Sequence, residues 1–141
     1  AFLTKQDPAF TVEELEEAMQ KVMDQYAGGI GTHYQFNEKQ LAMAEEKIKK
    51  LQILAKGLAA ADMHELMFIY ELKERLTVCL TVIAHLRARK ETRWHSFAEN
   101  LDYPEKSDAW LCYVNSKKNG DQITMIRRDL VKGGETYEHR D

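Results

Sequence analysis

Histidine and carboxylate spacings give this chain little scope for metal chemistry. His64 and Glu65 begin like the zinc-binding pattern HExxH, which places two histidines one helical turn apart, but Phe68 stands where the second histidine is required. His85 and His95 lie in separate segments, and neither has a cysteine or carboxylate companion at a ligand spacing. We therefore expect these histidines to be structural hydrogen-bonding residues, and we expect no metal site.

The glycine-rich stretch AGGIG, residues 27–31, resembles a phosphate-binding loop only superficially. A dinucleotide fingerprint needs GxGxxG between a strand and a helix, and a P-loop needs a following Gly-Lys-Ser/Thr. Here the glycines end an amphipathic segment, and glycine is favoured after a helix because it adopts the left-handed conformation at little cost. The stretch predicts a helix end and a turn.

The two cysteines, Cys79 and Cys112, are far apart and form no CxxC pair. Cys79 falls in an apolar stripe of helical period and Cys112 in a strand-like run, so we interpret both as small buried hydrophobic residues. A disulfide or a metal site is the less favoured alternative.

Cationic and aromatic side chains gather after residue 86. Cations at a helix C-terminus complement the helix dipole, which accounts for three of the four in the cluster Arg87, Arg89, Lys90 and Arg93. Arginine and large aromatic residues are also the types enriched in interface hot spots. This segment therefore either docks against a partner or covers the open end of a helical bundle. The interface candidates are Arg93, Trp94, Tyr103 and Trp110.

Three amphipathic helices are expected to position these residues. Each is preceded by a capping signature, in which the first residue accepts the backbone N–H of the residue three positions on: Thr11 with Glu14, Asn37 with Gln40, and Asp62 with Glu65. The first helix should run to about Tyr26. The second has an apolar seam at steps of three and four, made of Leu41, Ala44, Ile48, Leu51, Ala55 and Leu58. The third has a longer stripe, made of Leu66, Ile69, Leu72, Leu76, Leu80, Ile83 and Leu86.

The predicted fold is mainly α, with an up-down-up three-helix bundle of spectrin-repeat type over residues 11–90. Residues 91–109 have no sustained period and should form an irregular extension. Two β-prone runs, 110–115 and 122–127, flank a turn signal at Asn119-Gly120 and predict a small hairpin. Residues 132–141 read as a frayed tail. We expect residues 1–141 to form a single domain.

Composition indicates a globular chain: 141 residues are 44% hydrophobic and 30% charged, with a net charge of −3. This balance gives no bulk attraction to nucleic acid or anionic lipid, and no apolar run approaches the roughly 20 residues of a membrane span. We expect a cytoplasmic protein without nucleic-acid or membrane partners. Because the chain begins at Ala1 rather than at a methionine, we also expect it to be a processed product or a fragment of a longer polypeptide.

Four stretches resemble a known family: MDQYAGGIGTHYQFNEKQL, AAADMHELMFIYEL, RKETRWHSFAENLDYP, and the pattern W-x-C-x-V-N-S at residues 110–116. They are similar to the C-terminal region of the alpha subunits of adenylylsulfate reductases, within the succinate dehydrogenase and fumarate reductase flavoprotein family. Asn100 stands where that family often has an arginine, so no contact of that arginine is carried over.

The resemblance implies an oxidoreductase that binds FAD in a domain upstream of this region. In such enzymes adenosine 5′-phosphosulfate is reduced to sulfite and AMP with electrons from an iron–sulfur beta subunit. The principal catalytic and flavin-contacting residues lie upstream, so no catalytic, cofactor-binding or metal residue is assigned here and the isolated chain should be inactive. We expect it to brace the flavin domain of the same polypeptide and the subunit interface. The alternatives are the corresponding domain of a succinate dehydrogenase or fumarate reductase, or a stand-alone helical interaction module.

Overall fold

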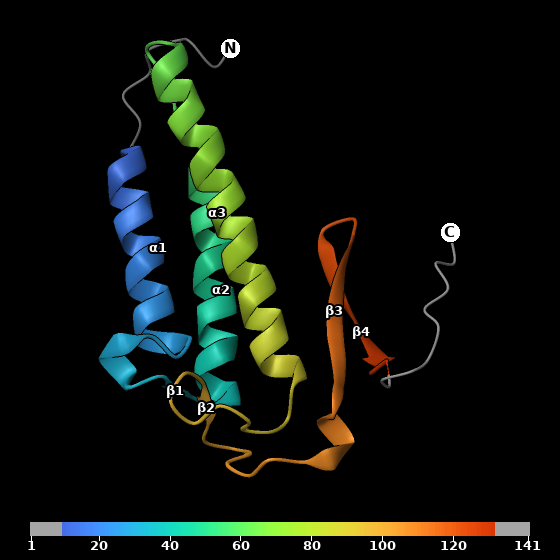
Figure 1. Cartoon of the computed structure of the whole chain (residues 1–141). Coiled ribbons are helices and arrows are strands. Elements are labelled where there is room, and N and C mark those ends of the chain that lie inside the picture. The colour runs from blue at the N-terminus through green and yellow to red at the C-terminus, as the bar shows by residue number, and fades with distance from the viewer. Residues whose placement is uncertain (1–9, 132–141) are drawn as a thin grey trace.

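Three long helices make up about half of the computed structural model, which describes residues 10–131 (Figure 1). They are α1 (Val12–Tyr26), α2 (Glu38–Ala55) and α3 (Met63–Ala88), and they lie side by side with alternating direction (Figure 1). The tail expected at 132–141 lies outside the described residues. Within the described range, no helix is both long enough and apolar enough to cross a membrane.

The predicted capping residues begin all three helices. In each case the side chain accepts the backbone N–H three residues on, at 3.2 Å for Thr11 and Glu14, 2.8 Å for Asn37 and Gln40, and 2.9 Å for Asp62 and Glu65. These bonds satisfy donors that have no partner within the helix. The helix starts are therefore fixed by local sequence.

The core forms where the apolar faces of the helices meet. All six residues of the predicted α2 seam are buried, and α1 contributes Leu15 and Met19. From α3 the buried members are Ile69, Leu72, Leu76 and Ile83, while the other members of its predicted stripe are partly buried. The apolar faces predicted from periodicity are confirmed.

The glycine-rich stretch ends α1 as predicted. Gly28 has a φ of +73°, and the chain then forms the short helix η1 (Ile30–Thr32). The loop folds back on α1, because the Asp24 carboxylate accepts the Gly31 N–H at 3.0 Å. A Cβ at Gly29 would lie 2.4 Å from Asp24 Cα, so this position has no room for a side chain.

The segment after α3 is more ordered than the irregular extension we predicted. β1 (Gln35–Phe36) pairs in parallel with β2 (Glu99–Asn100), and a short helix η2 (Asp108–Trp110) follows. Backbone bonds hold the pair, with Glu99 N–H donating to the Tyr34 carbonyl at 2.9 Å. Two-residue strands are too short to show alternation, so the sequence carries no signal for them.

The predicted hairpin is present beside α3, as β3 (Cys112–Asn119) and β4 (Gln122–Asp129) (Figure 1). Its turn differs from the prediction, because the strands extend into the expected loop until Asn119 faces Gln122. The two turn residues are Gly120, with a φ of +63°, and Asp121. Glycine at the first central position is typical of a type II′ turn.

Candidate docking surface

The exit from α3 is built around a buried carboxylate. The Glu91 side chain is 0% exposed, and it accepts bonds from Arg89 at 2.8 Å, from Arg93 at 2.9 Å through two nitrogens, and from the Ser107 N–H at 3.0 Å. Burial alone would raise the pKa of Glu91, but the bonds from Arg93, Ser107 and Arg89 outweigh it and hold the pKa below its usual value. Glu91 is therefore ionised, and we call this carboxylate with its partners Arg89 and Arg93 the clamp.

The same arginines reach beyond Glu91 to the backbone of later segments. Arg89 donates to the carbonyls of Trp110 and Cys112 at 2.7 and 2.9 Å, and Arg93 donates to the Ser107 carbonyl at 3.1 Å. A guanidinium group can serve several acceptors at once because it has five donors in a fixed plane. The end of α3 is thus tied to the loop and to the first strand of the hairpin.

A second set of bonds closes the loop around Thr92, which is buried. Its hydroxyl accepts the Asn100 N–H at 3.0 Å and donates to the Tyr103 carbonyl at 2.8 Å. The Asn100 side chain accepts the Asp102 N–H at 3.0 Å, and the Asp102 carboxylate accepts the Glu38 N–H at the start of α2 at 2.7 Å. The loop is therefore fixed to the helices at both of its ends.

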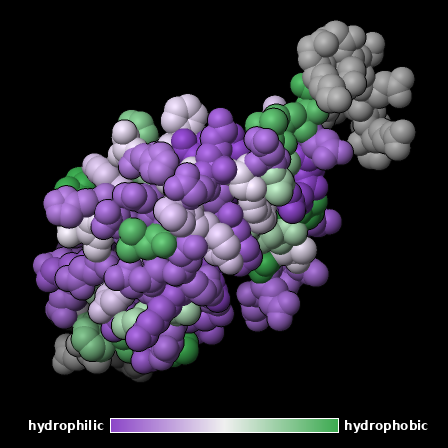
Figure 2. Space-filling model, turned by 90° about the horizontal axis from the view of Figure 1, so that it is seen from below, coloured by the Kyte–Doolittle hydropathy of each residue, from purple (hydrophilic) through white to green (hydrophobic). Residues whose placement is uncertain are grey.

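This fixed loop presents aromatic side chains to solvent. Trp94 and Phe97 are 69% and 74% exposed, and the N–H groups of Phe97 and Ala98 both donate to the Trp94 carbonyl at 3.0 Å. Tyr103 and Leu101 are exposed beside them. Figure 2 shows this end from below, where hydrophobic side chains stand singly or in small groups on a largely hydrophilic surface. We call the loop of residues 94–103 the aromatic loop.

The four interface candidates occupy two kinds of position. Trp94 and Tyr103 are exposed on the aromatic loop. Arg93 is 21% exposed and holds Glu91, and Trp110 is half-buried, with the guanidinium groups of Arg89 and Arg127 lying 6.0 and 4.1 Å from its ring. The hydrogen bonds of Glu91 and the cation–π contact of Arg89 connect Arg93 with Trp110.

Sequence reasoning missed two of the three buried polar residues of this region, Glu91 and Thr92; the third is Asn100. The available signal was the alternation Arg89, Glu91, Arg93, which places a carboxylate between two arginines directly after a helix end. Outside a helix, a carboxylate between two arginines can form charge-assisted hydrogen bonds that fix the conformation of a loop.

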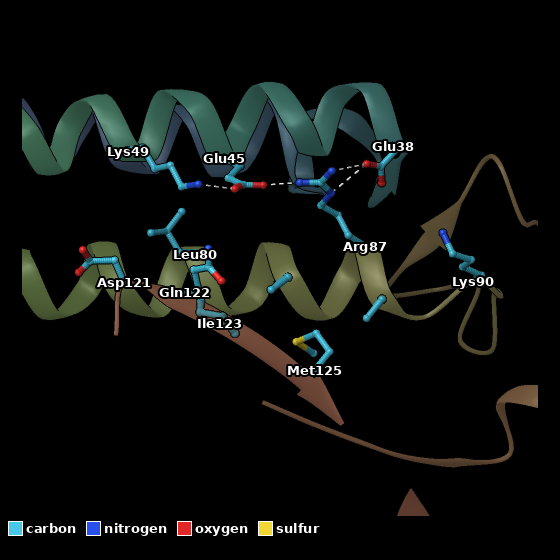
Figure 3. Close-up of a pocket in the computed structure, with 12 residues that line it drawn as sticks. Glu38, Glu45, Lys49, Leu80, Arg87, Lys90, Asp121, Gln122, Ile123 and Met125 are labelled. Carbon is cyan, nitrogen blue, oxygen red and sulfur yellow. Dashed lines mark hydrogen bonds and ion pairs between the residues drawn. The ribbon is translucent and has the colours of Figure 1, made fainter. Parts of the chain in front are cut away.

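A cleft of about 560 Å³ separates α2 and α3 from the hairpin (Figure 3). Along one wall Lys49 pairs with Glu45, and Arg87 pairs with both Glu45 and Glu38 (Figure 3). The bond from Lys49 is the main reason that the pKa of Glu45 lies below its usual value, and Arg87 adds to it. Because these charges satisfy one another, we interpret the wall as a brace between α2 and α3.

Metal and thiol chemistry find little support among residues 10–131. This part of the chain holds no group of three or more His, Cys, Asp or Glu side chains placed to bind a metal ion. Cys79 and Cys112 are half-buried, less than we predicted, and are not bonded to each other. Burial raises the pKa of the Cys79 thiol, which lowers its reactivity.

Comparison with known proteins connects this fold to flavoproteins. Residues 16–136 match the family model described as fumarate reductase flavoprotein C-term. The adenylylsulfate reductase subunit alpha of Megalodesulfovibrio gigas is 34% identical over 98 residues, which are 69% of this chain and 15% of that protein.

Solved structures give the same picture. Adenylylsulfate reductase from the hyperthermophilic Archaeoglobus fulgidus matches with a TM-score of 0.86 and 36% identity, over 95% of this chain and 21% of that one. An adenosine-5-phosphosulfate reductase in complex with sulfite matches with the same score and identity, over 96% and 22%. Quinol fumarate reductase from E. coli shares the fold, with a TM-score of 0.77 and 20% identity over 96% and 24%. This chain therefore spans less than a quarter of the length of these relatives.

Proposed function

This chain belongs to the fumarate reductase flavoprotein C-terminal family, and we propose that it is the C-terminal helical domain of an adenylylsulfate reductase-like flavoprotein subunit. The observation that carries the proposal is the identity to adenylylsulfate reductases across almost the whole chain, which exceeds the identity to fumarate reductase. In the full-length protein, FAD and electrons from an iron–sulfur beta subunit would reduce adenosine 5′-phosphosulfate to sulfite and AMP.

Within that enzyme the role we propose for this region is to brace the flavin domain and the subunit interface. Trp94 and Tyr103 would contact the flavin domain directly, since large exposed aromatic side chains are typical of docking surfaces. Arg93 and Trp110 would act by holding the aromatic loop in shape through Glu91 and Arg89. The isolated chain would have no activity of its own.

The proposal includes the organisation of the chain. We take residues 1–141 as one domain, with an up-down-up bundle of spectrin-repeat type over 11–90 and an extension with a hairpin over 91–141. The alternating directions of α1, α2 and α3 and their shared core support this division. A cytoplasmic setting is part of the proposal, and the two unpaired cysteines are consistent with a reducing compartment.

Binding to a flavin domain tests the proposal. The probe is the Archaeoglobus fulgidus alpha subunit produced without its own C-terminal region and carrying FAD, titrated with this chain by calorimetry. We expect a complex at micromolar concentration, weakened about tenfold by Trp94→Ala or Arg93→Ala, as is usual for hot-spot residues. Ile53→Ala is the matched control, because Ile53 is 66% exposed on α2, away from the aromatic loop. Absence of binding at micromolar concentration would count against the docking role.

A further inference from the structure

Helix α3 is apolar on two sides, and the core covers only one of them. Opposite its buried residues runs a line of side chains that are between 41% and 68% exposed, and we call this line the outer stripe: Met63, Met67, Tyr70, Val78 and Val82. Their spacing places them on one face of the helix, over about 29 Å at 1.5 Å per residue. A helix that is apolar all round is usually buried within a larger protein.

Two carboxylates, Glu71 and Glu74, interrupt the outer stripe near its middle. Glu74 is exposed between Tyr70 and Val78, and none of the ion pairs within residues 10–131 includes it. Its neighbour Glu71 differs, because it lies 3.7 Å from Arg75. A lone carboxylate within an apolar surface favours a partner that carries a cation at the matching place.

The outer stripe leads toward the aromatic loop. Below Val82, a hollow of about 230 Å³ is lined by His85 and Leu86 of α3, by Arg89 directly after the helix, by Trp94 of the loop and by Val114 of β3. Trp94 therefore borders both the hollow and the exposed loop. His85 stands three residues after Val82, so the outer stripe ends about one helical turn from the hollow that Trp94 lines.

We propose that the outer stripe is a second part of the docking surface, covered by the flavin domain of the same polypeptide through an apolar face that presents an arginine or lysine to Glu74. This inference rests on the proposed function. The short separation between Val82 and the hollow lined by Trp94 favours the same partner for both parts, and the solved relatives carry this fold as about a fifth of one longer chain. A second copy docked antiparallel about Glu74 is disfavoured, because it would bring two Glu74 carboxylates together.

The calorimetric titration with the FAD-loaded Archaeoglobus fulgidus flavin domain tests the outer stripe by substitution. Val78→Glu puts a charge into the stripe and replaces valine by a better helix former, so we expect binding to weaken at least tenfold while the helix stays folded. Glu74→Arg reverses the charge and should weaken binding to a similar degree, with Glu74→Gln intermediate. Ile53→Glu is the matched control and should bind like the unchanged chain. Circular dichroism melting of each variant verifies that the helices remain folded.

The outcomes separate the two proposals. Unchanged binding by Val78→Glu and Glu74→Arg, with the unmodified chain still binding, would overturn the outer-stripe proposal and leave the docking role intact. Failure of the unmodified chain to bind would overturn both. Sedimentation of the free chain adds a third readout: a dimer abolished by Val78→Glu would identify a second copy as the occupant and overturn the proposal.

Discussion

Glu91 is the residue on which the shape of the aromatic loop depends. A fully enclosed carboxylate is tolerated only when cations and N–H groups satisfy it, and here two arginines and one backbone N–H do so. The same contacts draw Arg93 away from solvent, so its contribution to docking should be indirect. Trp94 owes its exposure to this arrangement, because the clamp fixes the loop and leaves the ring outside.

Removing the charge of Glu91 should destabilise the fold. Glu91→Gln leaves Arg89 and Arg93 without their shared counterion, and we expect the free energy of unfolding to fall by about 2–4 kcal/mol. Urea unfolding followed by circular dichroism measures this difference. Glu105→Gln is the matched control, since Glu105 is an exposed carboxylate in the same segment between α3 and η2. An equal, small effect of the two substitutions would contradict the role of the clamp.

The clamp also predicts a pH dependence. The pKa of Glu91 lies below the usual glutamate value of about 4.5, so its contribution to stability is present above about pH 4.5 and is lost as the pH falls through the depressed value. The pKa of Glu45 is lowered as well, so the pH dependence of the unchanged chain alone would not isolate the effect of Glu91. The stability of the unchanged chain must therefore be compared with that of a Glu91 variant. The stability difference between the unchanged chain and Glu91→Gln should shrink on acidification below pH 4.5. A difference that stays constant down to pH 3 would be inconsistent with an ionised clamp.

At the scale of elements, local patterns determined most of what could be predicted. The capping residues and the α2 seam were read correctly, because N-caps and helical periodicity depend on neighbours within four positions. β1 and β2 could not be predicted, since Gln35 and Glu99 are joined by long-range backbone pairing. The hairpin was predicted but its turn was misplaced, because the pairing of Asn119 with Gln122 selects Gly120-Asp121.

The interface candidates show the same limit. Residue type identified Trp94 and Tyr103 as surface aromatics, and the structure places both in exposed positions. Arg93 is largely enclosed because its guanidinium group is bonded to Glu91. The sequence carries no periodic pattern from which that contact could be predicted. Thr92 was overlooked because a single threonine in a loop carries no pattern, although its hydroxyl joins the start and the end of the loop.

Two glycines give a matched test of the connections between helices. Gly29→Ala would set a Cβ against the backbone of Asp24, so we expect a loss of about 2 kcal/mol or more in the free energy of unfolding. At Gly57 the nearest atom to an added Cβ is the Leu54 carbonyl oxygen at 3.5 Å, an ordinary contact. Gly57→Ala should be neutral or stabilising by up to about 1 kcal/mol, because alanine restricts the unfolded chain. Thermal melts of both variants decide the point, and equal melting temperatures would show that the α1–α2 loop is not tightly packed.

In the molecule as a whole, some apolar side chains are packed in the core between the helices, and others remain exposed to solvent on one side. The core lies between the three helices, while the outer stripe and the aromatic loop leave large apolar side chains in solvent. A surface of this kind is typical of a domain that packs against more protein. We therefore propose that this chain, as the C-terminal part of a longer flavoprotein, docks on its flavin domain.

The coding sequence immediately upstream of Ala1 tests that claim most directly. We predict an uninterrupted reading frame that encodes, N-terminal to this chain, a GxGxxG fingerprint between a strand and a helix, as FAD binding in this fold requires. A start codon adjacent to Ala1, or a stop codon in the same frame before any such fingerprint, would contradict the account and favour a stand-alone helical interaction module.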